Sequence, residues 1–206
     1  KYFSKVLGFK VSIRINRNKV QKDEAYVSYP VEKIIKKQRN RLIMKELHSF
    51  LKHSNLEYKQ SKVEEYLDEF DYVFTHSPIK EHESGFGYNE GVFFFIILKI
   101  IDPELVIESG VMKGFTTYLI DVATNPDCKI YSYDINFENN MFNSKKAEYI
   151  NSDVTNKIPI MKNKKIVALW DDHTSQLDRL KFSQENNIDY NFFDDDLSLL
   201  NVHSDG

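Results

Sequence analysis

The fold of this chain depends on one stretch, residues 104–117, which reads ELVIESGVMKGFTT. Its first five residues form a short apolar run after Pro103, which is typical of a buried β-strand. The residues that follow contain Gly110 and Gly114 and lead into a helical pattern from Thr116 to Ala123. A strand, a glycine-containing turn and a helix in this order form the ligand-binding part of an open α/β sheet.

Four more β-rich runs follow along the chain, at 129–134, 147–150, 165–170 and 190–193. Helical intervals lie between the first two strands, at 116–123, and between the last two, at 175–185. Strands that alternate with helices pair in parallel through right-handed crossovers. The sequence therefore predicts an α/β fold with a doubly wound, mostly parallel sheet over about 85–206.

The residues before 85 differ from this segment in pattern and in charge. Helices are predicted over 31–53 and from Val63 to Val73, with Ser77-Pro78 ending the second. Residues 1–60 hold 15 Lys/Arg against 5 Asp/Glu, whereas the remainder holds 13 against 26. We therefore predict a basic, largely helical N-terminal arm over 1–84 and a second domain over 85–206. The positive charge of the arm is explained by a helical face exposed to solvent. The alternative is that the arm attracts phosphates or an acidic membrane surface.

The composition excludes several classes of protein. With 41% hydrophobic and 29% charged residues, the chain is neither disordered nor fibrous. It has no apolar run of the roughly 18 residues that a transmembrane helix needs, so we expect no such segment. The single cysteine, Cys128, excludes an internal disulfide framework and a cysteine-based zinc site, and it fits a reducing, cytoplasmic location.

Acidic residues end the second and third predicted strands. Asp134 lies about 20 residues beyond Gly114, where a carboxylate can accept both hydroxyls of a ribose. Asp153 follows the third strand and is placed to meet an adenine amino group. Each acid alone is more often a loop residue or a helix cap. Their common position at successive strand ends, together with the close backbone approach that Gly110 permits, predicts a ligand site.

These motifs resemble those of the class I S-adenosylmethionine-dependent methyltransferases, which have a Rossmann-like fold, over about residues 85–196. Residues 108–116 resemble the first motif of that family, 131–134 the second and 151–153 the third. That family fold normally has seven strands, so the resemblance implies that the sequence is incomplete at its C-terminus. It also implies a set of cofactor-binding residues: Glu108 and Gly110 beside the methionine part, Gly114 in the same motif, Thr116 at the carboxylate, Asp134 at the ribose and Asp153 at the adenine.

A second acidic group follows the fourth and fifth predicted strands. Trp170-Asp171-Asp172-His173 ends one strand, and Asp194-Asp195-Asp196 ends the next. Carboxylates that converge without a basic partner repel one another, so a cation would stabilise such a cluster. All-oxygen ligands favour Mg²⁺, with Mn²⁺ and Ca²⁺ as alternatives. Helix caps and solvated loop acids are the competing interpretation for either group alone.

This arrangement resembles the metal-dependent O-methyltransferases of the catechol, sugar or antibiotic type. By that resemblance the metal ligands are Asp172, Asp195 and Asp196, with Asp171 and Asp194 as alternatives one residue away. Thr174 stands where catechol-type enzymes carry a lysine, so His173 is the predicted general base beside the catalytic Asp172. A helix cap or a pairing with a neighbouring Asp is the other interpretation of His173.

The sequence thus predicts an S-adenosylmethionine-dependent, Mg²⁺-assisted O-methyltransferase that acts on a hydroxyl of a small molecule, such as a sugar or another polyhydroxy compound. The alternative from another class is a non-catalytic nucleotide- or partner-binding module with a basic docking arm. We expect no nucleic-acid substrate, and the sequence leaves a homo-oligomer open.

Overall fold

The computed structural model describes residues 29–54, 56–80, 86–156 and 164–194. The chain divides into two compact units, Lys1–Leu42 and Ile43–Gly206. Helix α1 (Tyr29–His53) begins in the first unit and ends in the second. The predicted boundary between residues 84 and 85 therefore falls inside the second unit.

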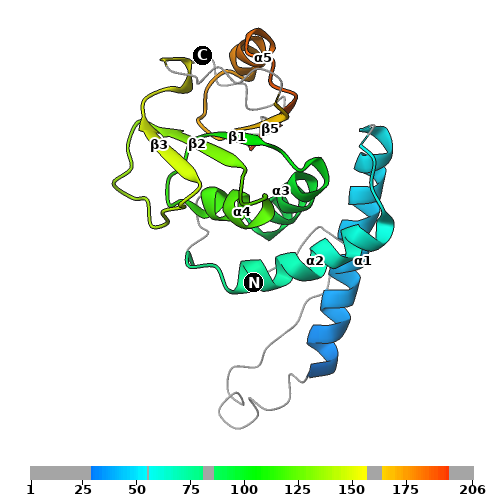
Figure 1. Cartoon of the computed structure of the whole chain (residues 1–206). Coiled ribbons are helices and arrows are strands. Elements are labelled where there is room, and N and C mark those ends of the chain that lie inside the picture. The colour runs from blue at the N-terminus through cyan, green and yellow to red at the C-terminus, as the bar shows by residue number, and fades with distance from the viewer. Residues whose placement is uncertain (1–28, 55, 81–85, 157–163, 195–206) are drawn as a thin grey trace. The chain divides into compact units, whose positions relative to one another are not determined.

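The second unit contains a five-stranded sheet with the order β3-β2-β1-β4-β5, and every neighbouring pair is parallel (Figure 1). The predicted α/β fold and all five predicted strands are confirmed, two with the expected bounds and three within one residue of them. Their bounds are β1 (Leu105–Ser109), β2 (Lys129–Asp134), β3 (Ala147–Asn151), β4 (Ile166–Trp170) and β5 (Tyr190–Phe193).

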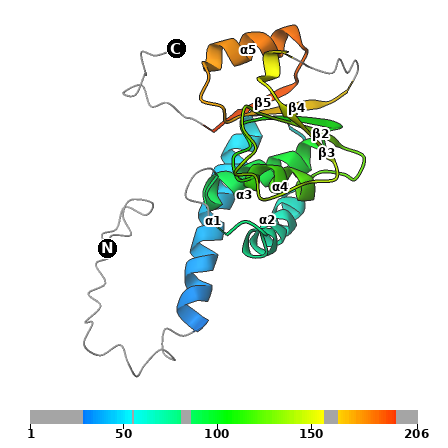
Figure 2. The same cartoon turned by 90° about the vertical axis from the view of Figure 1, so that its left-hand side faces the viewer.

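Helices cover both faces of this sheet (Figures 1 and 2). Helices α3 (Tyr88–Ile101) and α4 (Phe115–Ala123) lie on one face, and α5 (Gln176–Glu185) lies on the other. Successive side chains of a strand point to opposite faces, so Val106 joins the core under α3 and α4, whereas Ile107 joins the core on the α5 side. By the same alternation Glu108 faces α4, and Ser109 faces the α5 side.

Helix α2 (Gln60–Thr75) shares the first of these two cores. Its buried residues, Val63, Leu67, Phe70 and Val73, are three or four positions apart and form one face. The Phe70 ring packs against the ring of Phe95 in α3, with 5.5 Å between ring centroids. Residues 60–75 are therefore part of the core that supports the sheet. No helix in the described part of the chain has both the length and the apolar character needed to cross a membrane.

Candidate functional site

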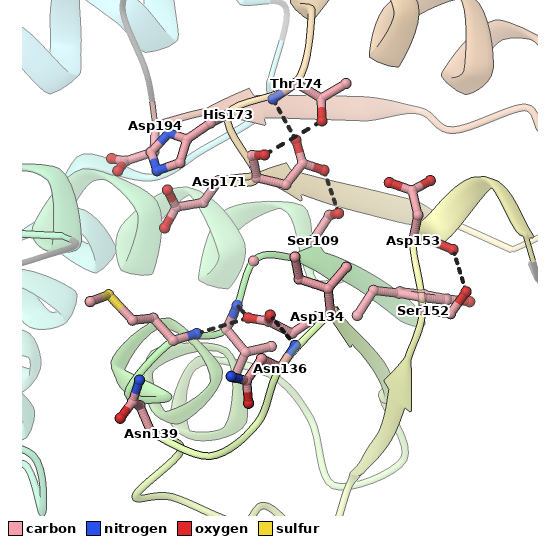
Figure 3. Close-up of a pocket in the computed structure, with 16 residues that line it drawn as sticks. Ser109, Asp134, Asn136, Asn139, Ser152, Asp153, Asp171, His173, Thr174 and Asp194 are labelled. Carbon is pink, nitrogen blue, oxygen red and sulfur yellow. Dashed lines mark hydrogen bonds between the residues drawn. The ribbon is translucent and has the colours of Figure 1, made fainter.

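A pocket of about 780 Å³ lies where the strands end. In open parallel sheets, ligands bind outside the carboxyl ends of the strands, at the point where the strand order reverses. Here that point lies between β1 and β4. The lining residues come from all five strand ends: Ser109–Met112 after β1, Tyr133–Asn136 and Asn139 after β2, Ser152 and Asp153 after β3, Asp171–Thr174 after β4, and Asp194 after β5 (Figure 3).

The pocket wall is acidic. Its sixteen lining residues in the described part of the chain include five aspartates and one histidine, and none of them is a lysine or an arginine. Such a wall attracts cations and hydrogen-bond donors and repels phosphate groups. The pocket therefore favours a ligand that carries positive charge, hydroxyls or amino groups over a nucleoside phosphate.

The turns after β1 and β4 contact each other closely at Gly110. The backbone N–H of Asp171 donates to the carbonyl of Ser109 at 2.8 Å. Gly110 has a φ of 94°, and a Cβ atom on it would lie 2.0 Å from the backbone oxygen of Asp171. Gly114, the residue before α4, has a φ of 83°, and its Cβ would lie 2.4 Å from the Oδ1 atom of Asn140. The predicted tight turn thus requires glycine at both positions, because conformation and space exclude a side chain.

Asp134, at the end of β2, holds the turn after β1 in place. Its Oδ2 atom accepts the backbone N–H groups of Val111 at 2.8 Å and of Met112 at 3.1 Å. Its Oδ1 atom accepts the backbone N–H of Asn136 at 2.9 Å. A carboxylate has about four acceptor positions, so one remains for a ligand.

Asp153, after the neighbouring strand β3, is in a similar state. Its Oδ1 atom accepts the backbone N–H of Thr155 at 2.8 Å and the hydroxyl of the same residue at 2.5 Å. Its Oδ2 atom accepts Nη2 of Arg179 at 2.7 Å. The hydrogen bond from Arg179 is the main cause that lowers the pKa of Asp153 to about 2. Asp153 also keeps about one acceptor position for a ligand.

Asp172, after β4, has one oxygen that its neighbours occupy fully. Its Oδ2 atom accepts the hydroxyl of Ser109 at 2.5 Å and Nε of Arg179 at 3.0 Å, and it forms an ion pair with Nη2 of Arg179 at 2.7 Å. Its Oδ1 atom accepts the backbone N–H of Thr174 at 3.1 Å. The acceptor positions of Oδ2 are therefore taken, whereas Oδ1 keeps about one.

Arg179 in α5 is a residue of this site that the sequence did not reveal. Burial alone lowers its pKa, but the two carboxylates Asp153 and Asp172 outweigh burial and raise the pKa above its ordinary value. Its guanidinium also lies over the indole of Trp170, 5.5 Å from the ring centroid. No feature of the sequence separates Arg179 from Lys181 on the same helix, which is exposed.

Three predicted cofactor residues do not line the pocket: Glu108, Gly114 and Thr116. Glu108 is fully buried and accepts the hydroxyls of Thr116, Thr117 and Ser132 at 2.5–2.7 Å. Burial raises the pKa of its carboxyl group. The alternation of side chains along β1 directs Glu108 toward α4, and this explains why it lies behind the pocket wall.

The remaining predicted residues are partly described. His173 lines the pocket, is exposed and has a φ of 55°, an uncommon backbone conformation for a residue other than glycine. Asp171 and Asp194 line the pocket beside it, and the backbone N–H of Asp194 donates to the carbonyl of Trp170 at 3.1 Å. The predicted metal ligands Asp195 and Asp196 lie outside the described residues. Among the residues that the structure does describe, no group of three or more His, Cys, Asp and Glu side chains is placed to hold a metal ion.

Comparison with known proteins identifies the family. The family model described as O-methyltransferase matches residues 56–204, which is more than half of the chain. The chain belongs to the O-methyltransferase family. The resemblance to class I S-adenosylmethionine-dependent methyltransferases is thereby confirmed. A search of curated proteins gave no match for this member of the O-methyltransferase family.

Solved structures similar to this O-methyltransferase family member are distant in sequence. A structure of CmcI with Mg-SAM is 14% identical, with 45% of this chain and 44% of that chain covered and a TM-score of 0.38. A putative O-methyltransferase from Klebsiella pneumoniae is 9% identical, with 68% and 65% covered and a TM-score of 0.39. The O-methyltransferase from Bacillus cereus in complex with SAH is 13% identical, with 72% and 60% covered and a TM-score of 0.30. The chain spans about half the length of the CmcI structures that it matches.

Proposed function

We propose that this protein transfers a methyl group from S-adenosylmethionine to a hydroxyl of a small molecule, such as a sugar or another polyhydroxy compound. Family membership supports the reaction class. The observation that carries the proposal is the acidic pocket at the strand ends, because it favours a cationic cofactor and disfavours the phosphates of a nucleotide. The proposal includes a cytoplasmic location, which the single cysteine supports.

The residues of the pocket fit S-adenosylmethionine. Asp134 and Asp153 lie at the ends of the paired strands β2 and β3, and each keeps about one acceptor position. The ribose hydroxyls and the adenine amino group are donors for these two positions. The backbone of Gly110 lines the same pocket without a side chain in the way. In this proposal Glu108, Gly114 and Thr116 shape the turn behind the pocket.

When bound, the cofactor supplies a methyl group that its sulfonium already activates. The protein must then orient the acceptor and take up the proton of its hydroxyl. His173 is the candidate for the proton, because it lines the pocket and an imidazole accepts a proton near neutral pH. The left-handed backbone at His173 fixes the direction in which the side chain leaves the turn after β4.

Assistance by Mg²⁺, or by Mn²⁺ or Ca²⁺, stays a prediction. In its described state the Oδ2 atom of Asp172 is not open to a metal ion, because Ser109 and Arg179 occupy it and the guanidinium already supplies the opposite charge. The other two predicted ligands, Asp195 and Asp196, lie outside the described residues. We therefore derive no step through a metal.

Calorimetry with S-adenosylmethionine and with S-adenosylhomocysteine on the folded protein tests the cofactor. We expect heat of binding with both, and none with adenosine diphosphate as the phosphate-bearing control. If neither S-adenosylmethionine nor S-adenosylhomocysteine binds, the cofactor assignment is wrong.

Methyl transfer is tested by screening hydroxylated acceptors with labelled cofactor, with and without excess EDTA. Label in an acceptor supports the proposal, and a loss of label with EDTA would support the metal prediction. Cofactor binding without transfer to any acceptor would favour the non-catalytic binding module. The His173→Gln variant should retain cofactor binding and lose most of the transfer, by about 100-fold or more if His173 is the general base.

A further inference from the structure

Helix α5 buries its arginine and exposes its leucines. The exposed fraction is 2% for Arg179, against 61% for Leu177 and 47% for Leu180. An amphipathic helix on a sheet normally presents the opposite arrangement. Local rules of this kind are broken at functional sites, where another requirement outweighs packing. The position of Arg179 must therefore be explained by the groups that it binds.

The guanidinium connects two strand ends that are not neighbours in the sheet. Its Nη2 atom donates to Oδ2 of Asp153 at 2.7 Å and forms an ion pair with Oδ2 of Asp172 at 2.7 Å. Its Nε atom donates to Asp172 at 3.0 Å. Asp153 follows β3 and Asp172 follows β4, and β2 and β1 lie between those strands. Arg179 thus sets the distance between two acids of the same pocket.

The same contacts decide which cation Asp172 holds. A partly buried carboxylate is stabilised by a partner of opposite charge, and the Nε and Nη2 atoms of the guanidinium both lie within 3.0 Å of Oδ2 of Asp172. A divalent ion on the Oδ2 atom of Asp172 would have to displace the two nitrogens of Arg179, and on Oδ1 it would lie close to the like charge of the guanidinium. Arg179 and a metal ion are therefore competitors for one carboxylate.

We propose that Arg179 is the positioning residue of the pocket: it holds Asp153 and Asp172 in one arrangement and supplies at Asp172 the positive charge that a divalent cation would otherwise supply. The inference rests on the proposed function for the role of Asp153 at the cofactor. It goes beyond that function by assigning the cation at Asp172 to the protein itself.

Ligand binding tests the positioning role. The Arg179→Lys variant keeps the charge but loses the planar fork, so it cannot bridge the two acids in the same way. We expect its dissociation constant for S-adenosylhomocysteine, measured by calorimetry on the full chain, to rise about tenfold or more. The control Lys181→Met removes an exposed cation from the same helix and should change the constant by less than about twofold. Equal affinity of Arg179→Lys and the unchanged protein would overturn the role.

Manganese binding, followed by electron paramagnetic resonance, tests the assignment of the cation. We expect the unchanged protein to bind no Mn²⁺ at Asp172, so that Asp172→Asn leaves its Mn²⁺ titration unchanged. Arg179→Met should gain Mn²⁺ binding, and the double variant with Asp172→Asn should lose it again. A purely structural arginine would not create a metal site when it is replaced. Tight Mn²⁺ binding by the unchanged protein that disappears in Asp172→Asn would overturn the proposal.

The two measurements also separate this inference from the proposed function. If the unchanged protein binds no S-adenosylhomocysteine, the proposed function is wrong, and the manganese titration still decides the cation at Asp172. If Arg179→Met does not fold, Arg179→Lys and the titration of the unchanged protein give the answer.

Discussion

The carboxylate of Asp134 accepts the backbone N–H of Val111 at 2.8 Å, so the end of β2 fixes the turn that follows β1. This bond joins two strand ends that both line the pocket, and it places an acid beside the turn on which cofactor binding depends in the proposed function.

Asp134→Asn should weaken both the turn and the binding of the cofactor. An amide nitrogen in place of one oxygen would face the N–H groups of Val111 and Met112, which would then lose their acceptor. The loss of such a partner destabilises a protein by about 1–3 kcal/mol. We expect calorimetry to show a rise of about tenfold or more in the dissociation constant of S-adenosylhomocysteine. Glu138→Gln, an exposed change in the same loop, is the control and should leave binding unchanged.

Gly110→Ala should destabilise the protein by about 2 kcal/mol or more, measured by urea denaturation. The φ of 94° is unfavourable for alanine, and the new methyl group would overlap the backbone oxygen of Asp171. Gly87→Ala is the matched control, because Gly87 has an ordinary φ of −74° and its Cβ would meet only the flexible end of Glu90. Similar losses for both variants would contradict the close contact between the two turns.

The protonation of Glu108 should make the free energy of unfolding depend on pH. Its pKa is raised by burial, so the folded state binds the proton more tightly than the unfolded state. This contribution is complete below the unfolded pKa, about 4.3, and is lost as pH rises through the raised pKa of the folded state. Glu108→Gln should remove that decline in the free energy of unfolding, while the exposed Glu148→Gln should keep it. An unchanged decline in Glu108→Gln would show that Glu108 is not its source.

Asp153 should have the opposite effect on stability: its contribution to the free energy of unfolding should be lost as the pH falls. Its pKa of about 2 lies below the ordinary value of 3.8, chiefly through Arg179. The stabilisation is present above that ordinary value and is lost as pH falls toward 2. Denaturation curves recorded between these pH values should show a smaller acid loss for Asp153→Asn than for the control Asp127→Asn, which changes an exposed residue. Identical curves for the two variants would contradict the bond to Arg179.

The sheet could be predicted from the sequence because its central strands β1 and β4 are buried on both faces. The runs LVI in β1 and IVALW in β4 are apolar, and glycines or polar residues follow them. The same reasoning placed Asp134, Asp153 and Asp172 at one edge of the sheet, since parallel strands end on the same side. The pocket confirms that they lie together.

Two parts of the site could not be predicted. The predicted first strand ended at Glu108, but the strand includes Ser109, and the face to which Glu108 points follows from packing against α4. The burial of Arg179 could not be predicted, because α5 exposes Leu177 and Leu180 and hydrophobic periodicity therefore indicates the wrong face of the helix. The partners of Arg179 come from strand ends far away in sequence, and no local pattern records them.

The hydrogen bond between Ser109 and Asp172 joins residues 63 positions apart. β1 is synthesised well before β4, its partner on that side, so in a nascent chain that has not yet reached β4 the backbone N–H and C=O groups on one edge of β1 are unpaired. Long-range parallel pairing of this kind forms slowly and exposes the chain to aggregation meanwhile. A chain that ends before β4 therefore lacks the residues that form one side of the pocket, so the pocket is complete only after β4 has paired with β1.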